Sequence, residues 1–97
     1  MMSLSDKTVD FSGALAIAST DAPDDYPDWG STTYASNMED LKDLWAEIRA
    51  TLKKDLDKVP FIDAKLQEAF FAFDSGEKEK GRKAILAIYN LEVKKLR

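Results

Sequence analysis

The chain has 97 residues, of which 44% are apolar and 33% are charged, and its formal net charge is −4. This length supports one domain with a modest core, and the composition is that of a folded protein. Cysteine and histidine are both absent, which excludes disulfides, zinc–cysteine sites, thiol catalysis and serine–histidine catalysis. We therefore expect no cofactor, no metal and no enzymatic activity.

Charge is distributed unevenly along the sequence. Residues 1–37 contain six aspartates and one lysine, whereas residues 77–97 contain seven basic and three acidic residues. This asymmetry predicts a charge match, either within the chain or with a partner. No run approaches the roughly 20 apolar residues of a membrane span. Asp6 and Asp10 precede the short apolar run 13–18, unlike the basic start of a signal peptide, so we expect a cytoplasmic protein.

The first 35 residues are expected to form an acidic arm. Apolar residues alternate with polar ones over part of this stretch, at Val9, Phe11, Leu15 and Ile17. That spacing favours a strand, although residues 12–16 could also open a short helix. Residues 32–34 have β character and could pair with it. We predict an extended or partly β arm over residues 1–35, laid across a helical domain of residues 36–97.

Residues 21–34, which read DAPDDYPDWGSTTY, raise the question of a calcium loop. An EF-hand loop needs acidic ligands at its first, third and fifth positions and glycine at its sixth. Counting from Asp25 places Gly30 sixth, but Pro27 and Trp29 then take the third and fifth positions. Counting from Asp24 places Trp29 sixth. The spacing therefore argues against calcium binding.

The same stretch is instead predicted to bind another protein. Its aspartates would steer the encounter with a basic surface, and its aromatic rings are of the kind that dominate interface energy. The competing interpretation is that Trp29 and Tyr34 fold back onto the helices while the prolines and Gly30 make turns. The predicted partner-binding residues are Asp24, Asp25, Tyr26, Asp28, Trp29 and Tyr34.

The first of three predicted helices covers residues 37–57. Ser36 with Glu39 matches the capping-box pattern, which places the start of the helix at this serine. Apolar residues then recur at helical spacing, at Leu41, Leu44, Trp45, Ile48 and Leu52. We expect this stripe to face the core.

The second and third helices are predicted to form an αα-hairpin. Pro60 suits the first turn of a helix over residues 60–74, and Gly76 can adopt the left-handed conformation that ends it. Ser75 could cap the third helix, over residues 76–96. With a connection this short the two helices should be nearly antiparallel, and the fold class is mainly α.

The third helix offers an alternative binding surface. Its basic residues Lys78, Lys80, Arg82 and Lys83 form a thin phosphate-binding face. Glu77 and Glu79 alternate with them, however, which is typical of a solvated helix face rather than a nucleic-acid site.

By elimination, the sequence favours a small, acidic, non-catalytic protein-binding module. Such a module would act as an adaptor or as an inhibitor of a basic protein surface, as immunity proteins, antitoxins and phage-encoded inhibitors do. Two alternatives stay open at this point. One is a nucleic-acid-binding regulator that uses the third helix, and the other is a structural homo-oligomer subunit, for example a homodimer.

Overall fold

A computed structural model describes residues 3–97 and contains four α-helices and no strand in that range. The helices are α1 (Leu4–Asp21), α2 (Tyr34–Thr51), α3 (Val59–Asp74) and α4 (Lys78–Tyr89). Two short 3₁₀ turns, η1 (Leu56–Lys58) and η2 (Val93–Lys95), precede α3 and follow α4. The predicted mainly α class is therefore confirmed. Within the described range, every helix is too short or too polar to cross a membrane.

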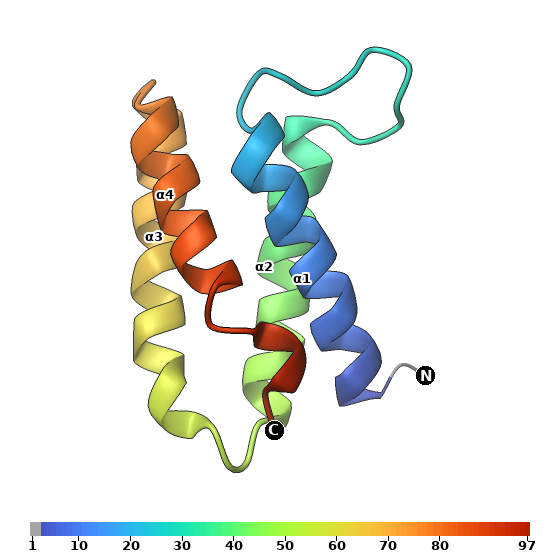
Figure 1. Cartoon of the computed structure of the whole chain (residues 1–97), viewed down its shortest axis with the longest axis vertical. Coiled ribbons are helices and arrows are strands. Elements are labelled where there is room, and N and C mark those ends of the chain that lie inside the picture. Colours follow the sequence, from blue (N-terminus) through green and yellow to red (C-terminus); the bar gives the residue numbers. More distant parts are fainter. Residues whose placement is uncertain (1–2) are drawn as a thin grey trace.

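The helices pair into two antiparallel hairpins that stand side by side (Figure 1). One hairpin consists of α1 and α2, and the other of α3 and α4, while α1 also packs against α4 and η2. A long loop, residues 22–33, arches over one end of the molecule, and the link 52–58 joins the hairpins at the opposite end (Figure 1).

Both hairpins contribute to one continuous hydrophobic core. Phe11 of α1 is fully buried and stacks on Trp45 of α2, with 5.7 Å between the ring centroids. Tyr34 of α2 meets the edge of Phe73 of α3 at 6.1 Å. The first contact joins the two helices of one hairpin and the second joins the two hairpins, and buried rings contribute much of the packing energy of a small core.

The prediction of an extended N-terminal arm is wrong, because residues 4–21 form α1. Ser3 and Asp6 start the helix with a capping box: the Asp6 N–H donates to Ser3 Oγ at 3.2 Å, and the Ser3 N–H to Asp6 Oδ2 at 3.3 Å. The buried residues follow helical spacing: Thr8, Phe11, Ser12, Ala14, Leu15 and Ala18. Val9 and Ile17, which suggested alternation, lie outside this stripe and are 51% and 36% exposed. The helix therefore has apolar residues on a second, exposed face, and together with the buried ones they produced the alternation that predicted a strand.

The predicted limits of the next helix also need correction. Thr33, not Ser36, is the N-cap of α2, and Ser36 completes the capping box from inside the helix. The Ser36 N–H donates to Thr33 Oγ1 at 3.1 Å, and the Thr33 N–H to Ser36 Oγ at 2.9 Å. The helix ends at Thr51 rather than at residue 57, because the N–H groups of residues 53–55 turn to the Arg97 carbonyl oxygen.

The predicted αα-hairpin is present, but both predicted limits of its second helix, residues 76 and 96, are wrong. Pro60 lies in the first turn of α3, and Gly76 adopts the left-handed conformation with φ of 80°. The N-cap of α4 is Glu77 rather than Ser75, without a side-chain cap. The last helix ends at Tyr89, because Glu92 takes a left-handed conformation (φ 57°) that turns the chain back toward α1.

Candidate functional site

The acidic loop is fastened to the basic helix of its own chain. Lys78 of α4 reaches Asp24 Oδ1 at 2.8 Å and Asp25 Oδ2 at 3.1 Å, and Arg82 Nη2 reaches Asp25 Oδ2 at 2.6 Å. Arg82 Nε also donates to the Ala22 carbonyl oxygen at 2.7 Å. We call these contacts the loop clasp. The loop clasp pairs the acidic loop with the basic helix of the same chain, which is one of the two forms of charge match that the sequence predicted.

The clasp shifts the ionisation of its members. Hydrogen bonds from Arg82 and then Lys78 lower the pKa of Asp25 below its ordinary value. Hydrogen bonds to Asp24 and Asp25 raise the pKa of Lys78. Both shifts favour the charged forms, so Asp25 and Lys78 stay ionised at neutral pH.

The two tyrosines predicted to bind a partner turn inward. The Tyr26 hydroxyl donates to Asn37 Oδ1 at 2.7 Å, and burial raises the pKa of that hydroxyl above its ordinary value. The Tyr34 hydroxyl donates to Asp74 Oδ1 at 3.4 Å, with its ring packed on Phe73. Burial also raises the pKa of Tyr34, with the Asp74 charge as the second cause. These rings hold the loop and α2 in place. The competing interpretation is confirmed for Tyr34 and is wrong for Trp29, which is 90% exposed.

The remaining predicted residues of the loop point outward. Trp29 is 90% exposed, and Asp28 beside it is exposed as well. A turn closed by the Gly30 N–H on the Pro27 carbonyl oxygen, at 3.1 Å, places this indole at the tip of the loop. The structure therefore divides the six predicted residues into four that contact their own chain and two that do not.

The alternative basic face divides in the same way. Lys80 and Lys83 are exposed, whereas Lys78 and Arg82 are half-buried within the loop clasp. Phosphate contacts need cations that are free to displace counterions. Only half of the predicted face therefore offers such cations without breaking the clasp.

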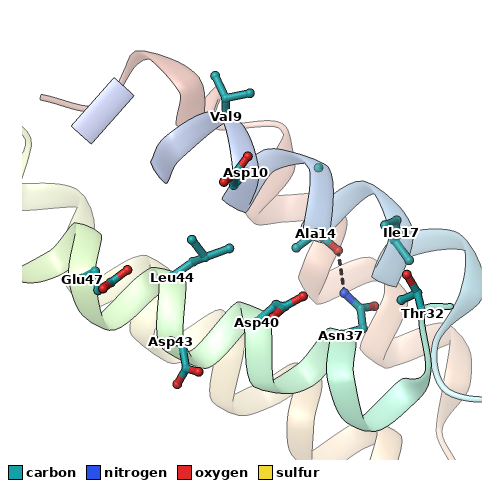
Figure 2. A pocket seen from close by; sticks show the side chains of 11 residues that line it. Val9, Asp10, Ala14, Ile17, Thr32, Asn37, Asp40, Asp43, Leu44 and Glu47 are labelled. Carbon is teal, nitrogen blue, oxygen red and sulfur yellow. Dashed lines mark hydrogen bonds between the residues drawn. The ribbon is translucent and has the colours of Figure 1, made fainter. Parts of the chain in front are cut away.

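A groove of about 660 Å³ runs between α1 and α2 and was not predicted from the sequence. Figure 2 shows it from close by. Its apolar lining, which we call the floor, consists of Val9, Gly13, Ala14, Ile17 and Leu44. At one end, Asn37 closes the floor by donating from Nδ2 to the Ala14 carbonyl oxygen at 3.2 Å, and Thr32 of the loop lies beside it (Figure 2).

The border of this α1–α2 groove is acidic. Asp10 stands on α1, and three further carboxylates stand on α2: Asp40, Asp43 and Glu47 (Figure 2). No lysine or arginine among residues 3–97 lines the groove. In the same range, none of the four carboxylates takes part in an ion pair. No three acidic side chains of the described residues converge as metal ligands do.

Two features of the sequence concealed the groove. Leu44 belongs to the apolar stripe of α2, which predicts a buried position, but its side chain is only partly buried. Val9 and Ile17 were assigned to an extended arm, so their alignment on one helical face could not be seen. The spacing of Asp40, Asp43 and Glu47 beside Leu44 was the available signal, because residues three and four apart share a helix face.

Comparisons with protein-family models, with curated proteins and with solved structures give no match to this chain. Its function must therefore be argued from the groove, the loop and the clasp.

Proposed function

We propose that this protein is a non-catalytic protein-binding module that covers a basic protein surface with its α1–α2 groove. The observation that carries the proposal is the composition of the groove: an apolar floor beside four carboxylates that have no ion-pair partner within residues 3–97. Burial of the floor would provide affinity, since transfer of apolar surface from water is favourable at about 25 cal/mol per Å². The carboxylates would provide orientation and a fast encounter.

The tip of the loop supplies a second contact. Thr32 borders the groove, so the loop that carries Trp29 is continuous with it. An exposed indole next to Asp28 combines a large anchor with a charge of the same sign as the groove. A module of this kind inhibits its partner when the covered surface is the partner's own functional site, and it acts as an adaptor otherwise.

The nucleic-acid alternative has less support. The clasp occupies Lys78 and Arg82, and the acidic groove repels phosphate. A homo-oligomer would need basic side chains opposite the groove, which α4 supplies only in part. The exposed basic residues of α4, Lys80 and Lys83, are interleaved with Glu77 and Glu79.

Site-specific cross-linking in the cells that make the protein tests this proposal. A photoreactive residue at position 9, on the groove floor, should capture a partner with a basic surface. The same residue at position 71 is the control, because Phe71 is 68% exposed and lies on α3, outside the groove.

Charge variants complete the test. The triple variant Asp40→Asn, Asp43→Asn, Glu47→Gln should lose the cross-linked product. A matched triple variant at exposed carboxylates outside the groove, namely Asp57→Asn, Glu77→Gln, Glu79→Gln, should keep it. Equal capture from positions 9 and 71, or a product that survives neutralisation of the groove, contradicts the proposal.

A further inference from the structure

Gly13, in the middle of α1, has no explanation within its own chain. Glycine in a helix interior is destabilising relative to alanine, so a packing reason is expected. Gly81 in α4 has one: a Cβ there would lie 2.6 Å and 2.9 Å from ring atoms of Phe73. At Gly13, no atom of residues 3–97 lies within 4 Å of the Cβ position, apart from its two chain neighbours and the local helix backbone. The residue is also exposed.

Gly13 lines the α1–α2 groove from the α1 side. Val9 is one helical turn before it and Ile17 is one turn after it, so the three residues follow the same face of α1. The absence of a side chain between two apolar ones leaves a depression about 12 Å long, measured from residue 9 to residue 17. A glycine in such a position lets the backbone of another segment approach closely.

From these observations we infer that the groove holds a basic amphipathic α-helix of the partner, which crosses α1 at Gly13. This inference rests on the proposed function and names the element of the partner that enters the groove. A helix fits because its ridges, formed by side chains three and four residues apart, pack into a depression between helical side chains.

Other backbone conformations fit the groove less well. An added β-strand needs unpaired N–H and C=O groups along the groove, but α1 and α2 use theirs within the helices. A polyproline segment needs an aromatic-lined groove, and none of the residues that form this floor is aromatic.

The carboxylates define the charge of the bound helix. Asp10 stands on the α1 side, and Asp40, Asp43 and Glu47 stand on the α2 side (Figure 2). The bound helix would therefore carry lysine or arginine on both sides of its apolar stripe, with more of them facing α2. Partners without this charge pattern would leave the carboxylates buried and unpaired, which opposes binding.

Synthetic peptides of leucine and lysine test the helical part of the inference on the full chain. One probe of about 14 residues, roughly 21 Å long as a helix, has leucine at i, i+4 and i+7. The second probe has the same composition with its three leucines at i, i+2 and i+4, which is the strand pattern. We expect the first probe to bind roughly tenfold more tightly or better, with amide shifts at residues 9–17 and 40–47. Equal affinity of the two probes would overturn the helix.

Substitution of Gly13 tests the crossing point. Gly13→Leu fills the depression, and since no atom opposes the new side chain, the thermal midpoint should not fall. Affinity for the helical probe should drop roughly tenfold or more, because overpacking of a close contact costs at least this much. Ala64→Leu places the same side chain at an exposed position of α3 and should leave affinity unchanged.

The outcomes separate the two claims. If the Gly13→Leu variant binds the helical probe as tightly as the native chain, the proposed crossing point is wrong. The cross-linking result at position 9 can still support a protein-binding groove in that case. If position 9 captures no partner, the proposed function itself fails, whatever the peptides do.

Discussion

In the α3–α4 hairpin, a three-residue connection brings the helices together, and Gly81 accommodates the ring of Phe73. In the α1–α2 hairpin, a long loop joins the helices, and Gly13 accommodates nothing in the chain. The first hairpin uses its close contact for its own stability. The second leaves an apolar floor and four carboxylates toward solvent. A chain this small has little stability to spare, and the exposed apolar surface together with the helical glycine is the basis of the binding surface that we propose.

The largest effect is expected at the glycine that the fold needs. Gly81→Ala should lower the free energy of unfolding by about 1–2 kcal/mol, because overpacking against Phe73 outweighs the roughly 1 kcal/mol gained in helix propensity. Denaturant titration measures this change. In a double-mutant cycle with Phe73→Leu the two losses should be less than additive, since the smaller side chain makes room. Native-like stability of Gly81→Ala would remove the contrast between the hairpins.

An opposite and smaller effect is expected at Gly13. Gly13→Ala should raise the free energy of unfolding by about 0.5–1 kcal/mol, because it adds helix propensity without a clash. The mirror substitution Ala64→Gly, at an exposed position of α3, should lower it by a similar amount and so calibrates the measurement. A loss of stability in Gly13→Ala would mean that the fold does require this glycine.

The smallest effect concerns the loop clasp and depends on pH. The pKa of Asp25 is lowered in the folded protein, so its contribution is complete above the unfolded value near 3.8 and is lost as the pH falls through the lowered pKa. Carboxyl resonances and amide exchange of residues 24–30, followed by NMR during acid titration, should show the loop released in this range. Asp25→Asn should show release at neutral pH already.

Asp28→Asn is the matched control for this titration. Asp28 lies in the same loop and has no ion pair within residues 3–97, so its neutralisation should leave the acid transition unchanged. High salt should weaken the clasp in the native chain, because its aspartates are largely exposed and surface ion pairs are screened. An identical transition in both aspartate variants would show that the clasp does not hold the loop.

Local signals in the sequence were sufficient for much of the α3–α4 hairpin. Pro60 and Gly76 act through their own backbone preferences, which do not depend on distant residues, so the limits of α3 could be predicted closely. The caps of α2 were harder, because Thr33 with Ser36 and Ser36 with Glu39 are overlapping capping boxes in the same stretch. Local pattern alone could not choose between them.

Composition and short-range backbone preferences are properties of the chain alone. They were sufficient to predict the mainly α class and the αα-hairpin, and to exclude reactions and metal sites that need cysteine or histidine. The orientation of α1 depends on tertiary packing: Val9 and Ile17 face outward, while Phe11 and Leu15 face inward. An apolar residue carries the same pattern on either face of a helix, and only packing against other elements selects the face that is buried. The α1–α2 groove follows from that selection.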